Sequence, residues 1–257
     1  MESDEIECFT RRFNAMEVTF PDTAETWVLT KKLSDTACQY TQSDFELLGG
    51  PSGAYGTFEC HRAGNPSDTA IMKIFMQVPH GGSGGQTQSE MAGQASEKLD
   101  YYARSALEGY KQLKQAGCTS TPRLMGYKID RQGRDELVPG GYMVYMLLGK
   151  VPGVQLDTVY WSMSPEVREK IRGLFRVALE DCLNCGVHIV DTNMANLVWD
   201  GDNDKICITG IRNSEPAGPH NVWRDLEWIL WGLVVPPRGY IYSKETRVHP
   251  GTPGWKV

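Results

Sequence analysis

The chain has 257 residues, and its 26 Lys and Arg against 32 Asp and Glu give a net charge of −6 at pH 7. This balance argues against nucleic acid as a partner, because neutralising phosphates requires an excess of basic side chains. Apolar residues make up 40% of the chain, which is enough for a folded core and excludes wholesale disorder.

Targeting signals are not expected. The first seven residues carry four carboxylates, the opposite of the basic start of a secretory signal. The longest uncharged apolar stretch, residues 228–237, is far short of the ~20 residues that a membrane span requires. The seven Cys lack the spacing of a disulfide framework, so we expect reduced thiols, a cytoplasmic location and no membrane partner.

The first half of the chain predicts an antiparallel sheet with one helix. Residues 1–44 are interpreted as an N-terminal extension with three aromatic anchors, Phe13, Phe20 and Trp27. Short apolar runs bounded by Gly, Asn and Pro then predict about five strands, at residues 47–48, 57–61, 70–75, 122–129 and 141–148. Helical spacing of apolar residues predicts a helix over 96–116, and the glycines of residues 80–88 predict a mobile loop.

The second half predicts helices around a short hairpin. Ser164, Pro165 and Glu166 are typical of a helix start, and the helix is expected to continue to Gly186. Two short strands follow at residues 196–199 and 205–208, and a last apolar helix is predicted over 221–233. The residues beyond it are rich in Gly and Pro and predict an irregular tail.

Three segments could carry chemistry. Residues 49–58 are predicted to form a glycine-rich turn between two strands, where backbone amides could approach phosphate oxygens, although an ordinary hairpin would look the same. Lys73 lies inside an apolar strand and either reaches solvent or points a charge into a cleft. Asp191 and Asn196 lie five residues apart on a loop, where they could act as proton acceptor and metal ligand in phosphoryl transfer.

Taken together, residues 53–58, 70–73 and 191–196 resemble the protein-kinase-like superfamily in order and spacing. The resemblance covers about residues 45–235 and is strongest to short, degenerate kinase-like proteins of fungi. It implies an α+β, two-lobed fold, with a five-stranded antiparallel N-lobe at residues 45–149 and a reduced helical C-lobe with an irregular tail at residues 150–257.

The resemblance also implies roles for single residues. Lys73 would hold nucleotide phosphates, paired with Glu108 or, as the weaker choice, Glu97. The loop residues Gly53, Tyr55 and Gly56 and the hinge at residues 147–150, which begins with Leu147, would complete a nucleotide site. Asp191 would be the catalytic base and Asn196 a metal ligand.

The departures from the family pattern concern the metal and the base. Ile189 and Val190 stand where the family has a His-Arg pair, with His188 one residue earlier, and Asn193 replaces the loop lysine. Thr209 stands where the family has its metal-binding Asp, and a neutral hydroxyl cannot replace a carboxylate as a magnesium ligand. Losing ~4 kcal/mol of transition-state stabilisation would slow transfer about a thousandfold.

The leading hypothesis is therefore a pseudokinase that binds a nucleotide, another ligand or a protein partner in the cleft between its lobes. The alternatives are an atypical ATP-dependent phosphotransferase acting on a small molecule, and a cleft that now serves another metabolite. The cofactor would be ATP or none, with Mg²⁺ held only weakly through Asn196. A protein substrate is not expected, because only about 24 residues follow the predicted last helix.

Four other patterns are interpreted as structural features and not as functional sites. The three acids Asp200, Asp202 and Asp204 predict a solvated turn in preference to a calcium loop. The spacing of Cys182, Cys185 and His188 could suggest zinc, but a fourth ligand is missing and buried thiols are favoured. The tryptophans of the last helix predict core packing. Asp225 resembles the acid that ties the catalytic loop of kinases, yet it follows Thr209 by only 16 residues.

Overall fold

The computed structural model describes residues 8–48, 50–241, 246–248 and 254–257, and the chain divides into two compact units. The first unit comprises Met1–Leu107 and Leu124–Lys150, and the second comprises Glu108–Arg123 and Val151–Val257. Helix α3 (Tyr101–Ala116) contributes its residues up to Leu107 to the first unit and the remainder to the second.

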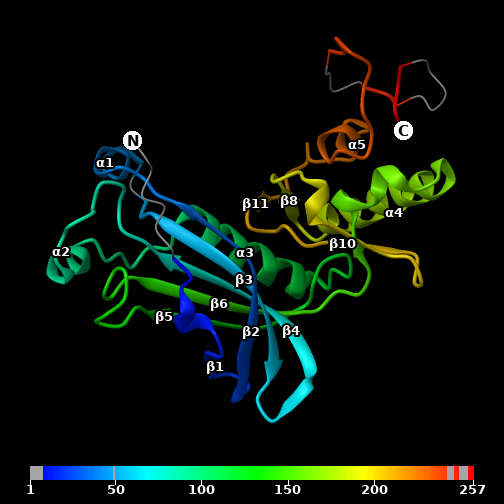
Figure 1. Cartoon of the computed structure of the whole chain (residues 1–257). Helices are drawn as coiled ribbons and strands as arrows, with labels where there is room; N and C mark the ends of the chain where they lie inside the picture. The colour runs from blue at the N-terminus through cyan, green and yellow to red at the C-terminus, as the bar shows by residue number, and fades with distance from the viewer. Residues whose placement is uncertain (1–7, 49, 242–245, 249–253) are drawn as a thin grey trace. The chain divides into compact units, whose positions relative to one another are not determined.

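The first unit is built on a six-stranded antiparallel sheet with the order β1-β2-β3-β4-β6-β5, of which Figure 1 shows β2, β3 and β4 side by side. Its strands are β1 (Glu17–Phe20), β2 (Glu25–Cys38), β3 (Gly53–Arg62), β4 (Asn65–Gln77), β5 (Leu124–Arg131) and β6 (Tyr142–Gly149). The predicted number of five strands is wrong. Residues 17–38, which we assigned to an extension, form β1 and β2, whereas residues 47–48 lie in helix α1 (Gln42–Leu48) and not in a strand.

The burial of side chains along the strands shows how the sheet packs on its core. Buried and half-buried residues alternate along β3, whereas β6, which pairs with strands on both sides, is buried along almost its whole length. The predicted anchors Phe13, Phe20 and Trp27 are buried in the same core and confirm that part of the prediction. The edge strands β1 and β5 are in contact, and a Cβ added at Gly126 in β5 would lie 3.2 Å from the Phe20 ring.

Residues 80–88, predicted to form a mobile loop, are held by polar contacts, and Gln88 already belongs to a helix. His80 and Ser83 are buried, and the Gln94 side chain accepts from the His80 backbone N–H at 2.9 Å and donates to the Ser83 hydroxyl at 2.9 Å. Thr87 and Glu90 form a reciprocal cap at the start of helix α2 (Gln88–Gly93). Side-chain hydrogen bonds therefore compensate for the backbone entropy of the glycines.

Helix α3 begins later than the predicted residue 96. The carboxylate of Asp100 accepts from the backbone N–H of Ala103 at 2.9 Å and of Tyr102 at 3.3 Å, which satisfies donors of the first turn. The predicted stripe is buried at Ala106, Tyr110 and Leu113. The chain leaves the helix at Gly117, whose φ of 76° is readily adopted only by glycine.

The second unit contains helix α4 (Pro165–Asn184), whose start agrees with the prediction. The hydroxyl of Ser164 accepts from the Val167 backbone N–H at 3.4 Å, and Pro165 occupies the first helical position.

The short strands of the second unit form two sheets, β10-β9-β7 and β11-β8. They are β7 (Val154–Gln155), β8 (Val187–Ile189), β9 (Leu197–Asp200), β10 (Lys205–Ile208) and β11 (Ser214–Pro216). Single-turn 3₁₀ helices are η1 (Arg11–Phe13) in the first unit and η2 (Leu156–Thr158), η3 (Tyr160–Ser162) and η4 (Met194–Asn196) in the second.

The hairpin of β9 and β10 and its turn agree with the prediction. The Asp200 side chain accepts from the backbone N–H groups of Asp202 and Asn203 at 3.2 Å each, and Asp204 forms an ion pair with Lys170. These acids therefore stabilise a turn.

The last helix, α5 (Leu226–Leu230), is much shorter than the predicted 221–233. The tryptophans nevertheless pack as predicted. The Phe175 ring of α4 lies 5.9 Å from the Trp223 ring and 5.2 Å from the Trp231 ring, between ring centres. Trp228 donates its indole N–H to the Arg172 carbonyl at 3.2 Å.

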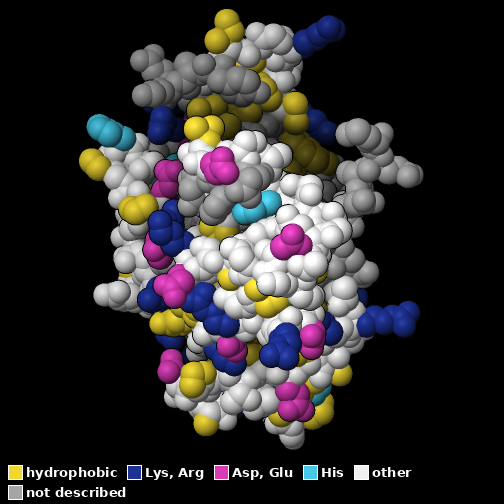
Figure 2. Space-filling model, turned by 90° about the vertical axis from the view of Figure 1, so that its left-hand side faces the viewer, with side chains coloured by type: hydrophobic (Ala, Val, Ile, Leu, Met, Phe, Trp, Pro, Cys, Tyr) yellow, Lys and Arg dark blue, Asp and Glu magenta, His cyan; other side chains and the backbone are white. Residues whose placement is uncertain are grey.

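On the face drawn in Figure 2, Lys and Arg side chains are interspersed with Asp and Glu side chains. None of the helices within the described residues has both the length and the apolar character needed to cross a bilayer.

Candidate functional site

The loop that carries Asp191 begins where helix α4 ends. Gly186 has a φ of 85°, and this left-handed conformation turns the chain from the helix into β8. Strand β8 pairs with β11 in an antiparallel ladder in which Ile189 lies opposite Ser214. The residues that follow Ile189 therefore lie opposite the residues that precede Ser214.

The next positions of this ladder bring Asp191 and Arg212 together. The backbone N–H of Val190 donates to the Asn213 carbonyl at 2.9 Å. The Asp191 carboxylate lies 2.8 Å from the Arg212 guanidinium, and the two side chains are 27% and 36% exposed. The carboxylate predicted to act as a base is therefore held in an ion pair by Arg212, for which the sequence predicts no role.

Polar side chains close the loop between Asp191 and Asn196. The Asn193 side chain caps the short helix η4 by accepting from the Ala195 N–H at 2.9 Å. Asparagine is a favoured cap residue, so this contact accounts for an asparagine at the position where the kinase family has lysine. The Asn196 side chain donates from Nδ2 to the Asp191 carbonyl at 3.2 Å. Asn196 is thus fixed by the loop that it closes.

Thr209 and Gly210 pack directly against Asn196. The backbone N–H of Thr209 donates to the Asn196 carbonyl at 2.8 Å, and its hydroxyl donates to the same oxygen at 3.2 Å. A Cβ at Gly210 would overlap the Asn196 side-chain amide. Tyr110 of helix α3 donates to the Thr209 carbonyl at 3.0 Å, so the helix fixes this segment within the second unit.

These residues do not fit a magnesium ion. The charges of Asp191 and Arg212 cancel, and Asn196 and Thr209 are neutral, so the four residues present no net negative charge. Mg²⁺ prefers carboxylate oxygens in near-octahedral geometry. Among the residues that the structure describes, the one group of His, Cys, Asp and Glu side chains close enough to hold a metal ion does not include Asp191.

The residues predicted to bind nucleotide lie mainly in the first unit. Lys73 is half-buried in β4, opposite Thr57 of β3 and Met146 of β6. Glu108 lies on an exposed position of α3, and Glu97 precedes that helix with its carboxylate 3.6 Å from Arg131.

The predicted glycine-rich turn is instead part of strand β3, which corrects the prediction for residues 53–58. A Cβ at Gly53 would lie 2.7 Å from the Asp100 carboxylate and the Tyr142 hydroxyl, and a Cβ at Gly56 would lie 2.8 Å from the Phe58 ring. Side chains of the same unit therefore occupy the space that these glycines leave. Tyr55 between them is half-buried, with its ring 6.0 Å from that of Phe75, between ring centres.

Leu147 also differs from its predicted place. It lies inside β6, pairs with Met72 and belongs to the hydrophobic core, so it does not follow the strand as a hinge. The strand ends at Gly149, and Lys150 forms an ion pair with Glu59 at 3.1 Å.

Two further sequence patterns are resolved within the second unit. The backbone N–H of Val248 donates to the Asp225 carboxylate at 3.2 Å, which anchors the C-terminal segment. His188 lies in β8 and does not join Cys185 in a metal-binding group; Cys185 is grouped with Cys118 and Asp181 instead.

Arg212 could not be found by motif, because its role depends on strand pairing. It lies 21 positions after Asp191, and only the ladder of β8 and β11 brings the two together. The available signal in the sequence is a cation three residues past Thr209.

No family model and no curated protein matches the chain. Among solved structures, the chain is similar to the PK-1 kinase of Cydia pomonella granulovirus, with a TM-score of 0.44 and 14% sequence identity. The similarity covers 74% of this chain and 52% of that chain, so this chain spans about half the length of the viral kinase. The predicted likeness to fungal proteins stays a prediction.

Proposed function

We propose that the chain is a kinase-like protein that binds a nucleotide through Lys73 and does not carry out magnesium-dependent phosphoryl transfer, and that it is therefore a pseudokinase. Its arrangement supports a kinase-like fold: strands β2 to β6 form five neighbours of the sheet, and α3 is inserted between β4 and β5. The second unit carries Asp191 and Asn196 directly before the hairpin of β9 and β10.

One observation carries the proposal that transfer is lost, namely the ion pair of Asp191 and Arg212 beside neutral Asn196 and Thr209. A general base must reach the proton that it abstracts, whereas here the carboxylate contacts a guanidinium. A magnesium ion is held mainly by carboxylates, and these four residues supply only that of Asp191, which is paired with Arg212.

Nucleotide binding is tested by thermal unfolding with ATP in the presence of EDTA. A ligand at a hundred times its Kd adds about 2.7 kcal/mol to the free energy of unfolding, so a shift in Tm is expected for the wild type. Lys73→Met should remove the shift. Lys128→Met is the matched control, because Lys128 is also a half-buried lysine of the same sheet. A shift that survives in Lys73→Met contradicts the proposed role of Lys73.

Catalysis is tested by phosphate release from ATP with Mg²⁺. We expect the wild type and Asp191→Ala to release phosphate at the same background rate. Release by the wild type that is abolished in Asp191→Ala would contradict the pseudokinase.

A second candidate, an atypical phosphotransferase acting on a small molecule, is favoured by one feature of the same ion pair. Both side chains are partly exposed, and ion pairs of this kind contribute only about 0–1 kcal/mol. A substrate could therefore displace Arg212 at little cost. This candidate predicts phosphate transfer that appears only when a small hydroxyl-bearing acceptor is added.

A further inference from the structure

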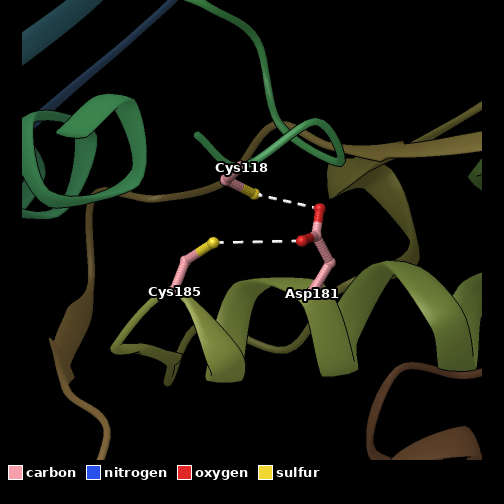
Figure 3. A group of neighbouring side chains, drawn as sticks. All are labelled: Cys118, Asp181 and Cys185. Atoms are coloured by element: carbon pink, nitrogen blue, oxygen red, sulfur yellow. Dashed lines mark hydrogen bonds between the residues drawn. The ribbon is translucent and has the colours of Figure 1, made fainter. Parts of the chain in front are cut away.

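Two cysteines and an aspartate of the second unit lie close together in a group that does not include Asp191. Cys118 follows helix α3, and Asp181 and Cys185 lie one turn apart at the end of helix α4. Figure 3 shows the three side chains pointing toward one another, with the two sulfur atoms directed at the Asp181 carboxylate. The topology thus joins residues that the sequence separates by more than sixty positions.

The distances within this group suit a tetrahedral metal ion. One ligand atom from each residue lies within 4.8 Å of the others. The Cys118 thiol donates to Oδ2 of Asp181 at 3.4 Å, and the Cys185 thiol donates to Oδ1 at 3.9 Å. Bonds to zinc of about 2.3 Å for sulfur and about 2.0–2.2 Å for oxygen place two ligands of one tetrahedron roughly 3.5–3.8 Å apart. The side chains are therefore close to the required spacing.

The carboxylate of Asp181 is already oriented for such a role. Its Oδ2 accepts from the backbone N–H groups of Thr119 and Ser120 at 3.1 Å each. Hydrogen bonds of this kind fix ligands in metal sites. Among the ion pairs in the described part of the chain, none involves Asp181, so no Lys or Arg in these pairs competes with a metal ion for it.

We propose that Cys118, Asp181 and Cys185 form a zinc site, with water as the fourth ligand. Two sulfur ligands select a thiophilic ion such as Zn²⁺ over Mg²⁺ or Ca²⁺, which prefer oxygen. Cys118 and Asp181 are half-buried, so the ion can reach the site from solvent. The bound ion would tie the segment after α3 to the end of α4. This proposal is independent of nucleotide binding.

Cobalt is the probe for the test, because Co²⁺ substitutes for Zn²⁺ and gives a thiolate charge-transfer band in the near ultraviolet. The full chain, kept reduced with a phosphine, is titrated with Co²⁺ and then with Zn²⁺. We expect the band to appear and Zn²⁺ to abolish it. Cys118→Ser and Cys185→Ser should each weaken Co²⁺ binding about 100-fold or more, because loss of an outer partner alone costs 10–100-fold.

Two variants sharpen this test. Asp181→Asn removes the charge while keeping an oxygen for the N–H groups of Thr119 and Ser120, so it should fold and bind Co²⁺ more weakly. Cys38→Ser is the control, because Cys38 is a partly exposed cysteine of the first unit, and it should leave the titration unchanged. A wild-type chain without the band, or a band that persists in both Cys118→Ser and Cys185→Ser, overturns the proposal.

Discussion

The Arg212 guanidinium lies 2.8 Å from the Asp191 carboxylate, where solvent still reaches both groups. Water screens such a pair, so its contribution to stability is small even though it decides which groups the carboxylate can contact. We expect Arg212→Ala to change the free energy of unfolding in urea by less than about 1 kcal/mol. A loss of several kcal/mol would mean that the pair is a structural element of the second unit.

Ionisation of Asp100 should make the stability of the folded chain depend on pH. Burial raises its pKa above the ordinary value of 3.8, while hydrogen bonds from Ala103 and Tyr142 oppose this shift. Because the folded chain favours the protonated acid, this contribution to stability is complete below the unfolded pKa and is lost as the pH rises through the folded pKa.

The corresponding variant is Asp100→Asn, which cannot ionise but keeps an oxygen for the first turn of α3. Because the wild type loses stability as Asp100 ionises, the free energy of unfolding of Asp100→Asn should rise relative to that of the wild type as the pH increases above the ordinary pKa of an aspartate. Urea denaturation at increasing pH measures this rise. A difference that does not vary with pH would show that the ionisation of Asp100 has no effect on stability.

Among the helices, Gly109 of α3 and Gly173 of α4 allow the same substitution, glycine to alanine, to be compared in two environments. A glycine inside a helix is usually about 1 kcal/mol less stable than alanine. A Cβ at Gly173 would meet nothing within 4 Å, whereas one at Gly109 would lie 2.6 Å from the Ser214 hydroxyl and 2.9 Å from the buried Ile211. Gly173→Ala should therefore raise the Tm and Gly109→Ala should lower it. An increase in both would show that the segment before β11 is not packed tightly on α3.

The elements with local signals could be predicted from the sequence. Helix α4 has its cap and its proline at Ser164 and Pro165, and it ends before Gly186. Strand β2 has no such signal. Its second half, from Thr30 onward, is largely exposed, so its side chains show no alternation, and it is a strand because its backbone pairs with β3.

Other elements depend on contacts with residues far away in the sequence, and for that reason they could not be predicted. The Trp stripe indicated a long helix, but the rings pack on α4 while only Leu226–Leu230 is helical. The glycines at positions 53 and 56 indicated a phosphate loop, but they accommodate neighbouring side chains within β3. In the candidate site, Asp191 and Asn196 are predicted from their spacing, whereas the contact of Arg212 with Asp191 depends on the β8 and β11 ladder.

For the molecule as a whole, the residues to which we assign the catalytic and metal-binding positions of a kinase-like pattern, Asp191, Asn196 and Thr209, all lie within the second unit. Asp191, Arg212, Asn196 and Thr209 sum to zero net charge. Magnesium binds ATP strongly in solution, so a kinase normally uses the metal complex as its ligand. If the chain holds no magnesium ion, as we propose, the ion should not increase its affinity for ATP.

The most direct measurement is the affinity of the full chain for ATP by isothermal titration calorimetry, first in EDTA and then in excess Mg²⁺. We expect ATP to bind in EDTA and Mg²⁺ not to lower the Kd. Binding that appears only with Mg²⁺, or that tightens at least tenfold (about 1.4 kcal/mol) when the ion is added, would contradict this expectation.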